Sequence, residues 1–313
     1  MKKFTLLCAL FLLLAVFGGC TAPETEDMTV WMIKGPTGIG AVHRMDKAGY
    51  DFRVAASQDE VVAKVLSGEY DIAALPTNLA AKLYARTGGA VTLLAVNTAG
   101  VLSVIERGDA VHSLADLAGK TMYSSGKGAT PEYVFRYLLT AAGLDPDRDV
   151  DLSFVADNDA LAAILASGET DLALVPQPTV STLLMQNADL RVALDLTDVW
   201  DALGTDSRLL MGCVVVRTDY LSAHPDRVAT FLDDYAASIA ATEDVTATAA
   251  LCERYGILPK AAVAARAIPD CHLCFLTGDE MKAALAPSLA VLHAADPQSV
   301  GGTLPDEEFY YVG

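Results

Sequence analysis

The chain has few basic residues and no long apolar run beyond its first 20 positions. Of its 313 residues, 22 are Lys or Arg and 40 are Asp or Glu, which gives a formal net charge of −18. Binding to nucleic acid needs a basic surface, so this charge balance argues against a nucleic-acid partner and against adsorption to anionic lipid headgroups. Because a membrane-spanning helix needs about 20 consecutive apolar residues, no span is expected beyond residue 20.

The sequence also lacks the short motifs of nucleotide, metal and hydrolase chemistry. It has no HExxH pair and no GxSxG segment, and the glycines over residues 35–40 are spaced GxxGxG rather than GxGxxG. We therefore expect no catalytic residues, no cofactor and no metal site. The 52% hydrophobic content is nevertheless enough to fill the cores of about two domains.

The amino terminus has the features of a secretory signal. Two lysines at the start precede an apolar stretch over residues 4–17, which is long enough for a signal peptide and short for a membrane span. We assign residues 1–19 to this signal peptide. An export signal places the rest of the chain outside the cytoplasm.

The end of the signal resembles the bacterial lipobox. Two glycines directly precede Cys20, and in lipoproteins a cysteine at this position is lipidated and becomes the first residue of the mature chain. The resemblance implies that Cys20 anchors the protein to the cell membrane through lipid alone. Residues 20–27, with one proline and three acids, then read as a tether. The alternative is an ordinary signal peptide followed by a chance cysteine.

An internal repeat at an offset of 100 residues indicates the architecture. The segment DEVVAKVLSGEYDIAALP over residues 59–76 matches DALAAILASGETDLALVP over residues 159–176. Each copy has apolar residues at helical spacing, a glycine that ends the helix, and a short apolar strand that ends at proline. Ser57 supplies a cap for the first helix, and Asp157 or Asn158 for the second.

A strand, a glycine-rich turn and a helix precede each copy of the repeat. Each half therefore reads strand, helix, strand, helix, strand, which is the pattern of a parallel sheet with right-handed crossovers. The sequence predicts an α/β protein of two similar lobes with mainly parallel sheets.

Ligands of such sheets bind beyond the carboxyl ends of the strands, at the starts of the helices. Thr130 followed by Pro131 is expected to be one such start, with the threonine as the N-cap. The free N–H groups there could hold an anionic or carbonyl oxygen; alternatively, these loops only make turns and caps. The candidate ligand-binding residues are Gly35, Pro36, Thr37, Gly38, Thr77, Asn78, Ser124, Ser125, Gly126, Thr130 and Gln177.

Several phrases together resemble one family. They are the lipobox-like start, the repeated Ser-Gly-Glu unit, GPTGIG at 35–40, HSLADLAGKTM at 112–122, Pro-Gln-Pro at 176–178 and LSAHPDRVATFLDDY at 221–235. The chain is thereby similar to bacterial ABC-transporter solute-binding proteins, in the group that binds nitrate, sulfonates, taurine and thiamine precursors. The resemblance implies the type II periplasmic binding fold, a small-molecule ligand, and an ABC permease and ATPase as partners.

The same resemblance implies that the chain passes between the lobes twice. Lobe 1 would contain residues 28–102, lobe 2 residues 103–217, and residues 218–313 would return to lobe 1. Apolar strands lie where the crossings are needed, over residues 91–105 and 209–217. A hinge that closes around the ligand is expected of such a frame.

Four cysteines remain beyond the proposed anchor, at positions 213, 252, 271 and 274. An extracytoplasmic compartment permits disulfides, and four thiols allow three complete pairings. A bridge from Cys252 to Cys271 or Cys274, or a set of buried free thiols, are both open at this point.

A receptor for an importer is the favoured function, and two alternatives stay open. One is an enzyme of the same fold, of the pyrimidine-synthesis or futalosine-pathway type, and the other is a ligand-sensing subunit of a signalling system. The candidate loops contain no arginine, the usual partner of an anion, and the repeated acids fall at the far ends of the strands. We therefore expect a small neutral or heterocyclic ligand that packs against Trp31 or Tyr123.

Overall fold

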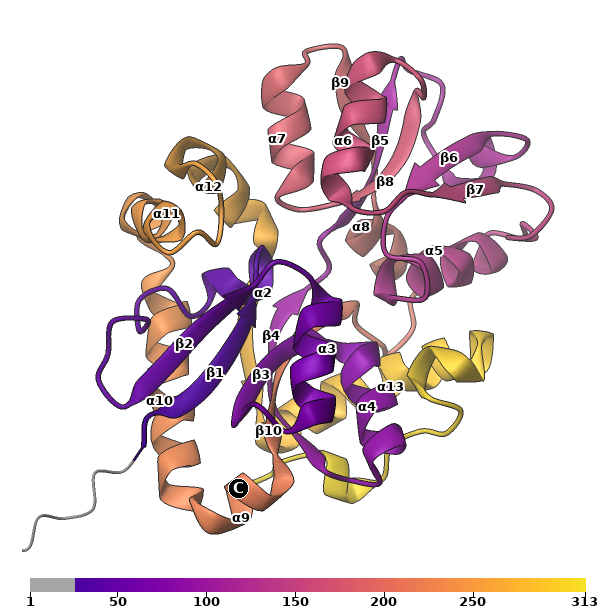
Figure 1. The fold of residues 1–313 in the computed structure, drawn as a ribbon. Coiled ribbons are helices and arrows are strands. Elements are labelled where there is room, and N and C mark those ends of the chain that lie inside the picture. Colours follow the sequence, from indigo (N-terminus) through magenta and orange to yellow (C-terminus); the bar gives the residue numbers. More distant parts are fainter. Residues whose placement is uncertain (1–25) are drawn as a thin grey trace, which may run out of the picture.

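The computed structural model describes residues 26–313, which form two α/β lobes, each built on its own sheet (Figure 1). The expected signal peptide over residues 1–19, Cys20 and most of the tether lie outside the described residues. Within the described part, no helix is both long and apolar enough to cross a membrane.

Lobe 1 contains the beginning and the end of the described chain. Its first part comprises β1 (Met28–Ile33), α2 (Pro36–Ile39), β2 (Tyr50–Ala55), α3 (Gln58–Ser67), β3 (Ile72–Pro76), α4 (Thr77–Thr87) and β4 (Val91–Ala99). Its second part comprises β10 (Leu210–Arg217), α9 (Thr218–Ala223), α10 (Pro225–Ala241), α11 (Val245–Arg254), α12 (Ala261–Ala267), β11 (Leu273–Thr277) and α13 (Gly278–Ala295). The six strands form one sheet in the order β11-β4-β10-β3-β1-β2.

Lobe 2 is formed by the middle of the chain. It comprises β5 (Leu102–Arg107), β6 (Thr121–Ser124), α5 (Thr130–Ala141), β7 (Asp151–Phe154), α6 (Asn158–Ser167), β8 (Leu172–Pro176), α7 (Thr179–Gln186), β9 (Leu190–Asp195) and α8 (Leu196–Asp201). Its five strands form a sheet in the order β7-β6-β8-β5-β9.

The sheets are mixed, which corrects the expectation of mainly parallel sheets. Strands β1, β2 and β3 are parallel, as are β6, β7 and β8, whereas β10 and β5 run antiparallel to their neighbours. The physical reason is the direction of entry. Strands β5 and β10 each arrive from the opposite lobe and therefore begin at the junction between the lobes. The edge strand β11 is also antiparallel to its neighbour β4 and begins at that end, and the remaining strands end there.

The second crossing lies earlier than expected. Strand β10 pairs along its length with β3 and β4 of the six-stranded sheet, so the chain is back in lobe 1 by Leu210. The boundary at residue 217 was therefore placed too late, because the apolar run over residues 209–217 is itself a strand of lobe 1. The first crossing lies between β4 and β5, at Gly100 and Val101.

The repeat folds into equivalent units. Helices α3 and α6 both end at a glycine in the left-handed conformation, Gly68 with φ 74° and Gly168 with φ 76°. Glycine adopts this conformation without the steric penalty of a side chain. Ser57 caps α3 as expected, and Asp157 caps α6 by accepting a hydrogen bond from the N–H of Ala160.

Helix α5 begins differently from the expectation. Ala129, with extended backbone, occupies the N-cap position, and Thr130 is the first helical residue. The Thr130 hydroxyl does not cap the helix because it donates to the Asn78 side chain of lobe 1 instead.

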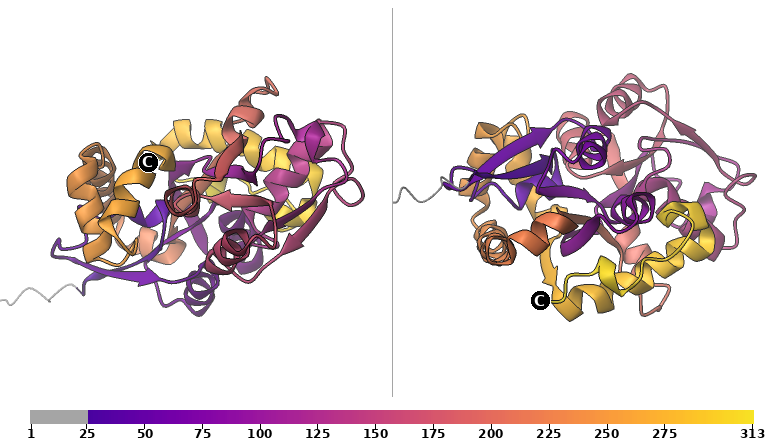
Figure 2. Two further views of the ribbon diagram at one scale, coloured as in Figure 1. Left: turned by 90° about the horizontal axis from the view of Figure 1, so that it is seen from above. Right: turned by 60° about the horizontal axis from the view of Figure 1, so that its bottom comes forward.

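The lobes touch on two sides of their junction. On one side α13 packs against α5, and their apolar side chains, including Phe135 and Leu289, belong to one continuous core cluster. On the other side α12 of lobe 1 contacts α7 of lobe 2. Figure 1 shows α13 running below α5, and the views in Figure 2 place the start of β1 on lobe 1, away from lobe 2.

Candidate functional site

A cavity of about 350 Å³ lies between the lobes, at the carboxyl ends of their strands. Lobe 1 contributes the segments after β1, β2 and β3, and lobe 2 contributes the segments after β6, β7 and β8. The two chain crossings supply Thr98, Val101, Met211 and Gly212. The cavity therefore has the position at which α/β sheets bind ligands, with both sheets contributing to one site.

Most of the residues expected from the sequence lie on this cavity, although they are far apart along the chain. Those that line it are Gly35, Pro36, Thr37, Ser125, Gly126, Thr130 and Gln177. Gly35 also approaches the other lobe, because a Cβ atom at this position would lie 3.8 Å from Cδ of Pro178.

The other four expected residues are buried behind the cavity wall. Thr77 donates to the carbonyl of Leu210 at 2.8 Å, and Ser124 donates to the carbonyl of Ser125 at 3.0 Å. Asn78 accepts from Thr130 across the lobe junction at 2.6 Å. A Cβ atom on Gly38 would lie 2.4 Å from the carbonyl oxygen of Ile33, so this glycine allows a close backbone approach. These residues support the site and do not line it.

Sequence reasoning missed the helix starts that follow β2 and β7. The cavity-lining residues there are Ser57, Gln58, Asp59, Asp157 and Asn158. Ser57, Asp157 and Asn158 were recognised from the sequence only as candidate helix caps. Because β2 and β7 are parallel to β1 and β6, the strand-end rule applied to every strand of each repeat would have identified these segments as well.

Oxygen atoms of the protein itself occupy the helix starts around the cavity. At α3 the Ser57 hydroxyl accepts the N–H of Glu60 at 3.3 Å, and at α6 the Asp157 carboxylate accepts the N–H of Ala160 at 2.8 Å. Ahead of α5 the Glu132 carboxylate accepts the N–H of Gly128 at 2.7 Å, one residue before the N-cap, and neither residue lines the cavity. Positions that could stabilise an anionic ligand are thus partly used by internal acceptors.

Two side-chain amides leave donors for a ligand. The Gln177 oxygen accepts from Ser181, from its N–H at 3.3 Å and its hydroxyl at 3.0 Å, and the Asn158 oxygen accepts from the Ser125 hydroxyl at 2.5 Å. Within residues 26–313, neither amide nitrogen has a protein acceptor. Both residues line the cavity, so two fixed NH₂ groups are available on the lobe 2 side.

The charged side chains on the cavity are Lys34, Asp59 and Asp157, and no arginine of the described chain lines it. All three side chains belong to exposed residues. The interior of the site is therefore neutral and polar, and an anion would meet two carboxylates and one lysine at the rim.

Prolines supply much of the apolar wall. They are Pro36, Pro76, Pro131, Pro176 and Pro178. The expectation that Trp31 or Tyr123 packs on the ligand was wrong, since neither lines the cavity. Trp31 is buried on the α3 side of its sheet, where its indole N–H donates to the Glu69 carbonyl, and Tyr123 packs in the core of lobe 2.

The four cysteines are free thiols, and three of them are buried. Cys252 and Cys271 lie in the small core between α11, α12 and α2, and burial raises the pKa of Cys252 to about 12. None of the four lines the cavity between the lobes.

Two mixed α/β lobes, two chain crossings and a cavity at facing strand ends define a bilobal solute-binding protein. Residues 46–253 match the family described as ABC transporter, phosphonate, periplasmic substrate-binding protein. This match covers more than half of the chain, so the protein belongs to that family. It is the extracytoplasmic, substrate-binding component of an ABC importer, as the resemblance seen in the sequence implied.

Solved structures have the same fold at low sequence identity. An ABC transporter protein from Parabacteroides distasonis is 24% identical, with a TM-score of 0.78 over 92% of this chain and 99% of its own. The aliphatic sulphonate binding protein SsuA from Escherichia coli is 17% identical, with a TM-score of 0.74 over 92% of each chain. The nitrate-binding protein NrtA from Synechocystis PCC 6803 is 17% identical, with a TM-score of 0.57 over 80% of this chain and 70% of its own. No curated protein sequence matches the chain significantly.

Proposed function

We propose that the imported substrate is a small uncharged molecule with hydrogen-bonding groups, such as a nitrogen heterocycle. The observation that carries this proposal is the pair of internal oxygens, from Ser57 and Asp157, that cap the starts of α3 and α6 at the cavity. The carboxylate of Asp157 lines the cavity at the start of α6, where a helix dipole would otherwise favour an anion. The amide NH₂ groups of Gln177 and Asn158 match carbonyl or ring-nitrogen acceptors on the ligand.

The family name and the names of the structural neighbours point to phosphonate, sulphonate and nitrate. Such anions are usually held by bidentate arginine or by several free backbone N–H groups. The absence of arginine from the described cavity wall and the use of helix starts by internal caps both favour a neutral ligand instead.

A binding screen tests this proposal. Pyrimidines, flavins, alkyl sulfonates and alkyl phosphonates are added to the purified protein, and thermal unfolding is followed for each. A true ligand at 100 times its dissociation constant adds about 2.7 kcal/mol to the stability of the folded state. Gln177→Ala should abolish the shift, whereas Gln186→Ala, an exposed change at the end of α7, should retain it. Stabilisation by phosphonates or sulfonates alone would contradict the neutral-ligand proposal.

We also propose that Cys20 carries a lipid and that the protein is a membrane-anchored lipoprotein. The two glycines before Cys20 and the acidic tether after it support this assignment. Cys20→Ser should release the protein from membranes without altering its unfolding transition, because acyl chains add membrane affinity and no core contacts. A variant that stays in the membrane fraction would exclude this anchor.

We infer that the protein releases its substrate chemically unchanged, as a transport role requires. Incubation of the identified ligand with purified protein, followed by mass spectrometry, tests this directly, and any converted product would favour the enzyme alternative. Permease and ATPase genes next to this gene would support import, whereas a neighbouring membrane receptor gene would support the sensing alternative.

A further inference from the structure

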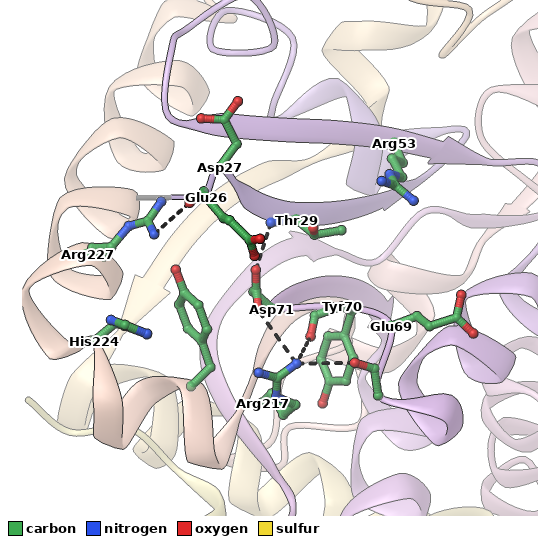
Figure 3. Close-up of a pocket in the computed structure, with 12 residues that line it drawn as sticks. Glu26, Asp27, Thr29, Arg53, Glu69, Tyr70, Asp71, Arg217, His224 and Arg227 are labelled. Carbon is green, nitrogen blue, oxygen red and sulfur yellow. Dashed lines mark hydrogen bonds and ion pairs between the residues drawn. The ribbon is translucent and has the colours of Figure 1, made fainter. Parts of the chain in front are cut away.

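A second cavity, of about 600 Å³, lies at the other end of lobe 1, where β1 and β3 begin (Figure 3). It is remote from the cleft between the lobes because parallel strands have their amino and carboxyl ends at opposite edges of a sheet. Its wall includes Glu26, Asp71, Arg217, Tyr220 and Arg227. We call this the basal pocket.

Tyr220 is the least satisfied polar group of the basal pocket. The side chain is 7% exposed, and its hydroxyl has no hydrogen-bond partner in the described part of the chain. A buried hydroxyl without a partner destabilises the fold, so a ligand that bonds to it is favoured. Tyr220 lines the pocket together with Arg227 and Asp71, so charges of both signs share this pocket with the hydroxyl. Burial raises the pKa of Tyr220.

Arg227 brings a positive charge that no carboxylate pairs within residues 26–313. Its guanidinium donates to the carbonyl of Glu26 at 2.9 Å and to the carbonyl of Gly49 at 3.3 Å. Arg217, by contrast, is held by Asp219 at 2.5 Å and by the carbonyl of Tyr70 at 2.9 Å. Among the two arginines, Arg227 is therefore the one without a carboxylate partner in the described chain, and it keeps donors for a ligand because a guanidinium has five N–H groups.

The opposite wall of the basal pocket is acidic. Asp71 accepts the N–H of Thr29 at 2.9 Å and lies 3.6 Å from Arg217, which leaves its second oxygen only weakly paired. Figure 3 shows the side chains of Glu26 and Asp71 pointing toward one another across the pocket. Two carboxylates in this arrangement favour a positively charged group between them.

We propose that the basal pocket binds a small zwitterion that carries a phosphate or carboxylate and a primary ammonium group. The anionic group is placed at Arg227 and the Tyr220 hydroxyl, and the ammonium group at Asp71 and Glu26. A simple anion would be repelled by the acidic wall, and a simple cation would leave Arg227 unpaired. This site is separate from the substrate cleft.

The zwitterion has two possible sources, a free solute or the phosphoethanolamine headgroup of a lipid. The lipid source rests on the proposed anchor, because Glu26 is only six positions after Cys20 and a chain of that length spans at most about 20 Å. The pocket wall that contains Glu26 would then stay close to the membrane surface.

The test uses the mature chain with Cys20→Ser and O-phosphoethanolamine as the probe, measured by isothermal titration calorimetry. We expect saturable binding at millimolar concentrations or below. Tyr220→Phe should weaken it about tenfold, the effect of losing one hydrogen bond to a charged group, and Asp71→Asn should weaken it similarly. Tyr220→Phe should fold normally, since the hydroxyl it removes has no partner among the described residues.

Controls separate this site from the cleft and from general effects. Tyr137→Phe, at a half-buried tyrosine of α5, and Gln177→Ala, in the cleft, should both bind the probe like the parent chain. Phosphocholine, which has the same phosphate but no ammonium N–H, should bind much more weakly.

A vesicle experiment distinguishes the two sources of the zwitterion. Cosedimentation with phosphatidylethanolamine–phosphatidylcholine vesicles, but not with phosphatidylcholine vesicles, would assign the lipid source. Binding of the soluble probe alone would assign a free solute.

Two results would overturn the proposal. One is that the parent chain does not bind phosphoethanolamine at concentrations of about 10 mM, or that Tyr220→Phe and Asp71→Asn both bind it as tightly as the parent chain does. The other is loss of binding in Gln177→Ala alone, which would show that the zwitterion is the substrate of the cleft. That second result would also contradict the neutral-ligand proposal, whereas the first would leave it intact.

Discussion

The hydrogen bond between Thr130 and Asn78 should be a main determinant of how the two lobes hold together. It joins the start of α5 in lobe 2 to α4 in lobe 1 at 2.6 Å, and the two residues are 1% and 0% exposed. Asn78 also donates to the carbonyl of Ser299 at 3.1 Å, so its amide links three segments of the chain.

Thr130→Val tests this bond with almost no change in shape. Valine fills the same volume, but it leaves the Asn78 oxygen buried without its donor. An orphaned buried acceptor costs about 1–3 kcal/mol, and we expect the upper half of this range because both groups are excluded from water. The free energy of unfolding, from urea titrations at fixed pH, measures the loss.

Thr140→Val is the matched control. Thr140 lies on the same helix, and its exposed hydroxyl bonds only to the carbonyl of Arg136, so the change should cost less than about 0.5 kcal/mol. A double-mutant cycle of Thr130→Val with Asn78→Leu should give a coupling energy of about 1 kcal/mol or more. Equal effects of the two valine substitutions would refute the reasoning.

The bond also bears on lobe closure. If it forms only when the lobes are closed, its loss should enlarge the unliganded protein, which small-angle X-ray scattering detects as a higher radius of gyration. Unchanged scattering with reduced stability would mean that α4 and α5 stay together in every state and that the opening occurs at α7 and α12.

Three further changes test the fold around the site. Gly38→Ala should lower the free energy of unfolding by about 2–3 kcal/mol in denaturant titrations, because the new Cβ atom would lie 2.4 Å from the Ile33 carbonyl oxygen. A decrease of less than about 0.5 kcal/mol would contradict this clash. Burial lowers the pKa of His43 below 6.5, so the folded protein favours the neutral imidazole. The free energy of unfolding should therefore fall as the pH drops from about 6.5 toward that lowered pKa. His43→Gln should flatten this pH dependence, and an unchanged profile would exclude His43 as its source. Burial raises the pKa of Cys274 to about 11, so a thiol reagent at pH 8 should label this half-buried cysteine slowly. The other three described cysteines are buried and should be labelled only after unfolding, so rapid labelling of Cys213 in the folded protein would contradict this.

Features decided by neighbouring residues could be predicted well. The repeat at an offset of 100 residues predicted matching helix and strand pairs, and α3 with β3 and α6 with β8 have the same bounds at that offset. Gly68 and Gly168 end their helices in the left-handed conformation because the next turn needs it, which is a local requirement. The resemblance to the family likewise rested on short sequence segments, such as GPTGIG at 35–40 and Pro-Gln-Pro at 176–178.

Features decided by side-chain direction across the lobes could not be predicted. Thr130 was expected to cap its own helix, but Asn78, 52 positions earlier, takes its hydroxyl. Trp31 was expected to face the ligand, but alternate residues of a strand face opposite sides of the sheet, and Trp31 faces the core. The strand over residues 209–217 is apolar whichever sheet it joins, so only its pairing with β3 and β4 assigned it to lobe 1.

The sequence by itself therefore determined the elements, the duplication and the edge of each sheet that borders the cavity between the lobes, because hydrophobic periodicity, capping and turn chemistry act within about ten residues. Tertiary structure alone decided which residues of those edges face the cavity and which are buried behind it. It also decided which charges meet in the basal pocket, which Arg227 and Asp71 line together although they are 156 positions apart in sequence. Such contacts depend on how whole lobes and helices pack, and no local pattern in the chain encodes them.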